Sequence, residues 1–267
     1  MIDKKVTIFG LSFHLYGFLI ALGILASAKA SAWLAKKRNY SENIIWDGLW
    51  WPVVPAIVGA RLYHVVDRWG DIYSIDPVKI LYVWNGGLGI IGGLIGGLIG
   101  LYLYWRFRLT AYRLPLTALL DLVFFGLPLG QAIGRFGNFF NQEVYGLPSS
   151  LPYSIFIDPD HRVSGFEQFS TFHPLFAYEG LWCLLGFGIM FAAIWKRSDL
   201  GRSDLFRIVR NSLTGFYLIW YGTGRFFLEF LRIPEFSWRI VGVDMAQVFS
   251  VLMIAGGIMT WRKSFYE

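Results

Sequence analysis

The chain has 267 residues, of which 55% are hydrophobic and 19% aromatic, and its mean hydropathy is +0.49. Only 16% of the residues are charged, whereas soluble domains contain about 25%. The formal net charge is +6, but the basic residues gather in short loops, which is typical of a protein oriented in a membrane and argues against a nucleic-acid-binding surface.

Seven stretches of the chain are long and apolar enough to cross a bilayer, which takes roughly 20 predominantly apolar residues. They cover residues 11–34, 44–66, 86–105, a run from 114 to beyond Gly130, 174–195, 212–231 and 243–261. A polar segment of residues 142–172, the head segment, separates the fourth stretch from the fifth. We therefore expect an all-α polytopic membrane protein with about seven transmembrane helices, in which residues 1–267 form a single transmembrane domain.

Clusters of basic residues indicate how these spans are oriented. They follow the first, third, fifth and seventh spans: Lys36, Lys37 and Arg38; Arg106, Arg108 and Arg113; Lys196, Arg197, Arg202, Arg207 and Arg210; Arg262 and Lys263. Because short cytoplasmic loops carry an excess of lysine and arginine, we expect the N-terminus outside and the C-terminus in the cytoplasm. The head segment is then extracytoplasmic, and its prolines and aromatic residues favour a small ordered structure over a linker.

Residues 130–146 end the fourth apolar run with an unusual concentration of polar groups. They read Gly-Gln-Ala-Ile-Gly-Arg-Phe-Gly-Asn-Phe-Phe-Asn-Gln-Glu-Val-Tyr-Gly. Such groups are unfavourable at membrane depth unless they face partners, water or a polar ligand. Arg135 offers a planar fork of donors that fits a phosphate or a carboxylate. The stretch predicts a lipid-phosphate site at the mouth of a helix bundle.

The polar residues of the other spans lie toward the same, outer side in this topology. They are His14, Tyr16, Arg61, Asn85, His173, Tyr178, Glu179, Arg225 and Glu229. Since charged groups inside a membrane are usually functional, a shared depth indicates one outer-side site. The structural alternative is an Arg225–Glu229 pair that neutralises itself, aligned on one helix face with Tyr217 and Tyr221. It leaves Arg135 and Arg61 without evident mates, because the possible mates Asp121 and Asp47 lie deeper or further inward.

No metal or cofactor is expected. The four histidines, His14, His64, His161 and His173, do not have metal-ligand spacing. The single cysteine, Cys183, lies in an apolar run and is interpreted as a small buried hydrophobic residue. The glycine ladders of residues 89–100 indicate close helix packing.

Several motifs resemble, in order and spacing, those of the prolipoprotein diacylglyceryl transferase family. The longest is Gly-Arg-Phe-Gly-Asn-Phe-Phe-Asn-Gln-Glu at 134–143, followed by Gly146. The others are His-Leu-Tyr-Gly at 14–17, Gly-Ala-Arg at 59–61, residues 84–96, His-Pro at 173–174 with Tyr178 and Glu179, and residues 221–225 with Glu229 and Arg232. Together they extend over most of the chain.

The resemblance implies an enzyme of the bacterial inner membrane. It would move the diacylglyceryl group of phosphatidylglycerol to the thiol of the lipobox cysteine in a prolipoprotein signal peptide and release glycerol phosphate. It implies catalytic roles for Arg135, Arg225, Glu143 and Tyr16. It also implies a phosphatidylglycerol site built from Arg135, Asn138, Asn141, Gly146, Arg225, Glu229, His14 and Tyr221, in which Arg135 binds the phosphate.

One position departs from the family pattern. Many members carry a histidine, sometimes proposed as the general base, where this chain has Ile91. One alternative is therefore an inactive relative that only binds lipid or lipoprotein. Another is a membrane transporter, which would need polar groups through the full membrane depth.

Overall fold

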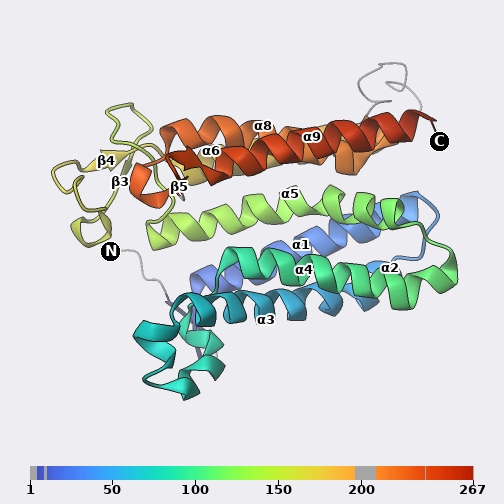
Figure 1. Ribbon diagram of the computed structural model, residues 1–267. Helices are drawn as coiled ribbons and strands as arrows, with labels where there is room; N and C mark the ends of the chain where they lie inside the picture. Colours follow the sequence, from blue (N-terminus) through green and yellow to red (C-terminus); the bar gives the residue numbers. More distant parts are fainter. Residues whose placement is uncertain (1–4, 9–10, 196–208, 238, 267) are drawn as a thin grey trace. The chain divides into compact units, whose positions relative to one another are not determined.

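The computed structural model describes residues 5–8, 11–195, 209–237 and 239–266 (Figure 1). The chain divides into two compact units, one formed from residues 1–31 and 120–267 and the other from residues 32–119. The division falls within helices α1 (Leu15–Lys37) and α5 (Leu116–Asn141). The expectation of a single transmembrane domain stays a prediction.

The first unit is mainly helical. Besides parts of α1 and α5 it contains α6 (Leu175–Trp195), α8 (Leu213–Leu228) and α9 (Met245–Tyr266). Three antiparallel two-stranded sheets accompany them: β1 (Lys5–Ile8) with β2 (Leu11–His14), β3 (Ile155–Phe156) with β4 (Thr171–Phe172), and β5 (Arg239–Ile240) with β6 (Val243–Asp244). Short helical turns are η6 (Pro159–His161), η7 (Glu229–Leu231) and η8 (Pro234–Phe236).

Small residues and one tryptophan pair bring the helices of the first unit together. Ser27 Oγ of α1 donates to the Gly126 carbonyl of α5 at 2.6 Å, and such contacts need the close backbone approach that glycine allows. Between α6 and α8, Trp182 and Trp220 stack with their ring centroids 4.2 Å apart. Each indole Nε1 donates to the backbone carbonyl of the other residue at 2.8 Å. These paired bonds fix the register of α6 against α8.

The head segment folds around an apolar cluster that it shares with the chain after α8. Tyr145, Ile157 and Phe172 of the segment, with Ile233 beyond it, are at most 1% exposed and form the centre of this cluster. The Tyr145 hydroxyl donates to the His161 carbonyl at 2.7 Å and accepts from the Val163 amide at 3.0 Å. Burial raises the pKa of Tyr145, so the hydroxyl stays protonated and keeps its donor role. The segment is thus ordered, as its prolines and aromatics predicted.

The second unit is built on one close helix pair. Its elements are α2 (Asn43–Gly48), α3 (Trp50–Asp67), η1 (Trp69–Tyr73), η2 (Pro77–Leu81), η3 (Val83–Asn85), α4 (Ile90–Tyr104), η4 (Trp105–Leu109) and η5 (Thr110–Tyr112). Gly92, Gly96 and Gly100 of α4 lie against the backbone carbonyls of Gly59, Pro55 and Trp51 of α3, leaving no room for a Cβ. The packing interpretation of this glycine ladder is confirmed.

Arg61 organises the loop that joins α3 to α4. It is 7% exposed, and all the described hydrogen bonds of its guanidinium go to backbone carbonyls: Ile80 at 2.9 Å, Gly86 at 2.7 Å, Gly87 at 3.0 Å, Tyr82 at 3.2 Å and, closer still, Lys79. Asp47, whose depth already argued against it as a mate, is not among these acceptors. Carbonyl dipoles replace the hydration of this cation, so that Arg61 acts as a centre for folding the loop.

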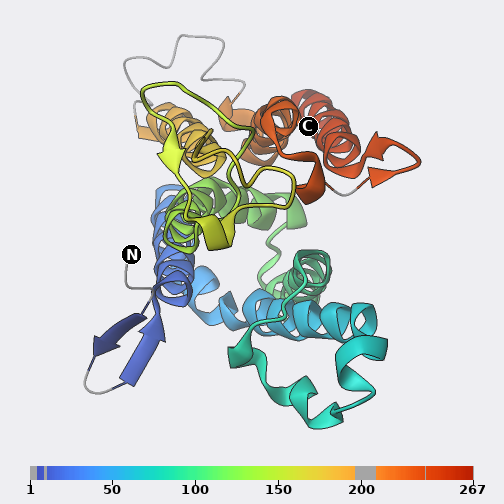
Figure 2. The same ribbon diagram turned by 90° about the vertical axis from the view of Figure 1, so that its left-hand side faces the viewer.

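The expected spans correspond to observed helices, with two differences. Among the described residues, six helices are long and apolar enough to cross a membrane, whereas α8 has 16 residues. The start of the first expected span was wrong, because residues 11–14 form strand β2, which pairs with β1 (Figure 2). Val6 and Thr7 lie opposite Phe13 and Ser12, and β-branched and aromatic residues favour such pairs.

Candidate functional site

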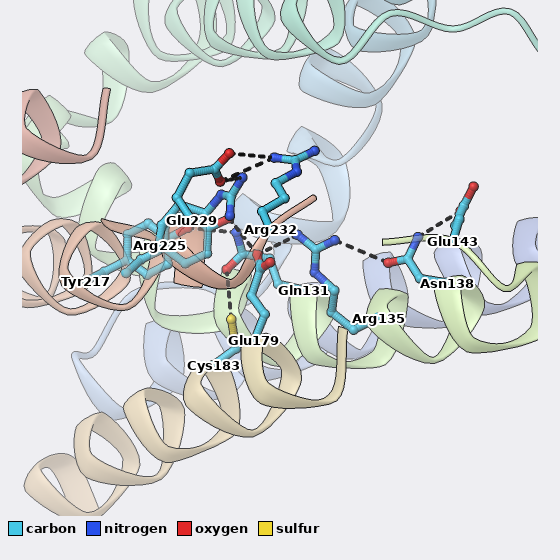
Figure 3. A network of polar contacts seen from close by, with 11 residues as sticks. Gln131, Arg135, Asn138, Glu143, Glu179, Cys183, Tyr217, Arg225, Glu229 and Arg232 are labelled. Carbon is cyan, nitrogen blue, oxygen red and sulfur yellow. Dashed lines mark hydrogen bonds and ion pairs between the residues drawn. The ribbon is translucent and has the colours of Figure 1, made fainter. Parts of the chain in front are cut away.

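Three carboxylates form the polar centre of the first unit, where α5, α6 and α8 meet (Figure 3). Glu179 comes from α6, Glu229 follows α8, and Glu143 follows α5. Glu179 and Glu229 are 4% and 6% exposed. A carboxylate so buried needs a charged or hydrogen-bonding partner, and each of the three has its own.

Glu179 holds Arg135 and Tyr221. Arg135 Nη2 forms a short ion pair with Glu179 Oε1, and the Tyr221 hydroxyl donates to the same oxygen at 2.9 Å. The other terminal nitrogen, Nη1, donates to Asn138 Oδ1 at 3.2 Å. The Arg135 side chain remains 25% exposed. The guanidinium is thus oriented from two sides while part of it stays accessible.

Glu229 holds two arginines at the end of α8. Arg225 Nη2 lies 2.6 Å from Glu229 Oε2, and Arg232 Nη1 lies 3.4 Å from the same atom. Ser237 Oγ donates to the other oxygen at 2.9 Å. The expected Arg225–Glu229 pair is confirmed. Since one carboxylate faces two guanidinium groups, the pair does not neutralise itself, and the cluster keeps an excess of positive charge.

Glu143 is held by amides. Its Oε1 accepts from Asn138 Nδ2 at 2.8 Å and from Asn141 Nδ2 at 3.4 Å. Asn138 therefore bridges Arg135 and Glu143, with its oxygen toward the cation and its nitrogen toward the carboxylate (Figure 3). This pattern also assigns the orientation of the Asn138 amide. Among the described contacts, Glu143 is the one carboxylate of the three without an arginine.

The remaining predicted site residues lie around this centre. Tyr16, the second residue of α1, packs its ring against Gly137 of α5. His14 ends strand β2, and its side chain lies outside the described part of the chain. Gly146 donates its amide to the His173 carbonyl at 2.8 Å. A Cβ on Gly146 would lie 2.5 Å from the Leu231 carbonyl oxygen, so its geometry indicates close backbone packing.

The sequence patterns did not predict the role of Glu179 as the partner of Arg135. Asp121, whose depth already argued against it as a mate of Arg135, accepts from the backbone amide and hydroxyl of Thr214 at 2.9 and 2.7 Å. Glu179 reaches Arg135 because α6 packs on α5 beside it: a Cβ on Gly180 would stand 3.5 Å from the Arg135 Cβ, at an ordinary contact distance. The available signal was Glu179 itself, because a carboxylate inside an apolar run needs a partner.

Neither metal ligands nor a reactive thiol accompany this centre in the described residues. No group of three or more histidine, cysteine or acidic side chains there could hold a metal ion. Cys183 is 1% exposed, with its sulfur 3.8 Å from Gln131 Oε1. Burial of this kind is typical of a structural cysteine.

The apolar helices and this polar centre are those of a multi-pass membrane protein with a cluster of partly accessible arginines, each paired with a buried carboxylate. The family model "prolipoprotein diacylglyceryl transferase" matches residues 4–262. The chain therefore belongs to the prolipoprotein diacylglyceryl transferase family.

Individual relatives agree with this family. A protein of Synechococcus elongatus named phosphatidylglycerol–prolipoprotein diacylglyceryl transferase is 39% identical over 93% of this chain and 82% of its own length. The protein of Streptomyces coelicolor named as transferase 2 of this kind is 38% identical over 91% of this chain and 73% of its own length. A protein of Parasynechococcus marenigrum with the same name as the first is 36% identical over 94% of this chain and 90% of its own length.

Proposed function

We propose that this protein transfers the diacylglyceryl group of phosphatidylglycerol to the thiol of the lipobox cysteine of prolipoproteins. The observation that carries the proposal is the pair of arginines, Arg135 and Arg225, each oriented by its own buried carboxylate. Planar guanidinium groups held in this way suit a phosphodiester, whose two free oxygens accept paired hydrogen bonds. The names of the relatives support the same substrates.

The reaction follows from where charge develops. A bond forms between the thiol sulfur and the terminal glycerol carbon of the diacylglyceryl group, while the bond between that carbon and the phosphate oxygen breaks. Glycerol phosphate leaves with the electron pair and gains negative charge. Arg135 and Arg225 stabilise that charge, because preorganised donors in a water-poor site act without reorganising.

Glu143 accepts the thiol proton in this proposal. Protonation of Glu179 or Glu229 would break an ion pair with arginine, whereas Glu143 loses no ion pair among its described contacts. Asn138 couples the two functions, since it touches both Arg135 and Glu143. A histidine at position 91 is then not required. Tyr16 and His14 are assigned to the phosphatidylglycerol site in this proposal.

The decisive experiment is a transfer assay with a lipobox peptide in phosphatidylglycerol vesicles. Arg135→Ala removes a phosphate ligand and a charge-stabilising donor, and we expect its kcat/KM to fall by at least about 10³-fold. Arg239→Ala changes an exposed arginine of strand β5 and serves as the matched control. An unaltered protein that binds phosphatidylglycerol but transfers nothing would instead be a non-catalytic relative.

The proposed setting is the bacterial inner membrane, crossed seven times, with α8 as the sixth span. The N-terminus and the head segment then lie outside and the C-terminus in the cytoplasm. Single cysteines introduced by Asp160→Cys and Ser198→Cys in a Cys183→Ala background test this topology. In intact cells an impermeant thiol reagent should label position 160 and leave position 198 unlabelled. The opposite pattern would reverse the orientation and remove the argument from a shared depth.

A further inference from the structure

The turn that carries Glu143 has an unusual backbone. Helix α5 ends with two hydrogen bonds, from the Gln142 amide to the Phe139 carbonyl at 3.1 Å and from the Glu143 amide to the Asn138 carbonyl at 3.0 Å. This pattern places Gln142 at the position where helices most often end with glycine. Its φ is +53°, in the left-handed region that a residue with a side chain rarely adopts.

The residue after Glu143 is also in the left-handed region. Val144 has a φ of +56°, and a β-branched residue there is an outlier. Glu143 is therefore bracketed by two strained residues. Such conformations persist only where the surroundings over-determine them, and they occur preferentially at functional sites.

This turn begins the head segment, and residues further along the chain hold it. Gln142 Nε2 donates to Asp158 Oδ2 at 2.7 Å, and the Asp158 amide donates back to Gln142 Oε1 at 2.7 Å. Both polar ends of the Gln142 side chain are thus used on one residue of the head segment. Two residues beyond Val144, the Gly146 amide donates to the His173 carbonyl. The turn is held on both sides of Glu143.

The carboxylate itself is held from the opposite direction. Asn138 and Asn141, both on α5, donate to its Oε1. The backbone of Glu143 is therefore positioned by the head segment and its side chain by α5. A carboxylate that only balanced charge would not need both supports.

We infer that Gln142 and Asp158 are positioning residues, through which the head segment holds the Glu143 carboxylate at the place where it receives the thiol proton. This inference rests on the proposed transferase function. The head segment then acts as part of the reaction machinery, and not only as an extracytoplasmic cover. Neither residue touches the substrate in this account, so both act through Glu143.

Gln142→Gly separates positioning from folding. Glycine suits the left-handed backbone, so relief of strain offsets the lost side-chain bonds, and we expect the thermal midpoint to stay within about 4 °C. The kcat should nevertheless fall by about 10- to 100-fold, since a displaced base loses its effect. The KM for phosphatidylglycerol should not change, because Arg135 and Arg225 are unchanged.

Val241→Gly is the matched control. Val241 has a φ of +50° and is 97% exposed in the β5–β6 hairpin, so the kcat of this variant should equal that of the unaltered protein.

Two further comparisons test whether the effect passes through Glu143. Asp158→Asn keeps an acceptor oxygen and the backbone amide, so it should lose less kcat than Asp158→Ala. In a Glu143→Gln background, Gln142→Gly should cause little further loss, because the group that it positions is already absent. An undiminished further loss would mean that Gln142 acts elsewhere, and a Gln142→Gly enzyme with unaltered kcat would overturn the inference.

A measurement independent of turnover keeps the two proposals apart. If the unaltered protein transfers nothing, the proposed function fails, and the contact is judged by thermal unfolding of Gln142→Ala, Asp158→Ala and the double variant. Non-additive effects would support the contact between Gln142, in the turn after α5, and Asp158, and strictly additive effects would overturn it.

Discussion

Arg61 and Arg135 are both arginines in apolar helices, but their guanidinium groups are used in different ways. Arg61 is almost fully buried and donates to five backbone carbonyls of its own unit. Arg135 is a quarter exposed and is held by the carboxylate of Glu179 and the amide of Asn138. The first arrangement saturates the cation and organises a loop. The second orients the cation and leaves it available to an anion.

The comparison shows that an intramembrane arginine is not identified as a ligand-binding group by its burial. What distinguishes the two arginines is the kind of group that accepts the hydrogen bonds of the guanidinium. Carbonyl oxygens carry no net charge and are fixed by the fold, so a ligand cannot displace them without unfolding the loop. A carboxylate shared with a tyrosine, as at Glu179, balances the charge at one edge of the guanidinium and leaves the rest accessible, as the proposed phosphate contact requires.

The largest effect expected from this comparison is at Arg225, which has the same type of acceptor as Arg135. Arg225→Lys keeps the charge beside Glu229 but removes the planar fork. We expect kcat/KM for diacylglyceryl transfer to fall by about 100-fold while the thermal midpoint changes little. Arg239→Lys is the control for a surface arginine. Full activity in Arg225→Lys would reduce the Arg225–Glu229 pair to a structural role.

An intermediate effect, on stability, is expected at Arg61. Arg61→Lys supplies three donors from one nitrogen and leaves carbonyls of the 79–87 loop unpaired. Each buried carbonyl left without a partner lowers the free energy of unfolding by about 1–3 kcal/mol. The thermal midpoint should fall by several degrees, and amide hydrogen exchange in that loop should accelerate. If Arg61→Lys left the thermal midpoint unchanged but abolished transfer, Arg61 would serve the reaction as Arg135 does, and the contrast between the two arginines would be wrong.

The smallest effect is expected at Ile91. If Glu143 accepts the proton, Ile91→His adds a base that the reaction does not need, and kcat should change by less than about threefold. The measurement is the same transfer assay across a range of pH. Restoration of turnover by Ile91→His in an otherwise inactive protein would mean that Glu143 is not sufficient as the base.

The sequence predicted those features that depend on neighbours along the chain. The helix positions, the Arg225–Glu229 pair at four-residue spacing and the glycine ladder of α4 all follow from local periodicity, and the structure contains them. The strand at 11–14 was missed because its apolar residues were counted as the start of a span. In a hairpin, the alternation of side chains and the pairing with the neighbouring strand determine the structure, and the count of apolar residues does not.

The partners of the isolated arginines could not be predicted in this way. Arg135 and Glu179 are 44 residues apart, and only the packing of α6 on α5 brings them together. Arg61 has backbone acceptors, which every residue carries, so no residue type in the sequence marks them. The bracketing of Glu143 by two left-handed residues is equally invisible, because glutamine and valine do not signal that backbone conformation.

The stacked indoles of Trp182 and Trp220 give this site an optical consequence. Their rings are 4.2 Å apart and nearly parallel, at 12°, which is close enough for their electronic transitions to couple. They join α6, which carries Glu179, to α8, which carries Tyr221 and Arg225. Circular dichroism spectra of the unaltered protein and of Trp182→Phe should therefore differ by an exciton signal, and the size of this signal reports the spacing of these two helices. Titration with phosphatidylglycerol would show whether that spacing changes when the lipid binds.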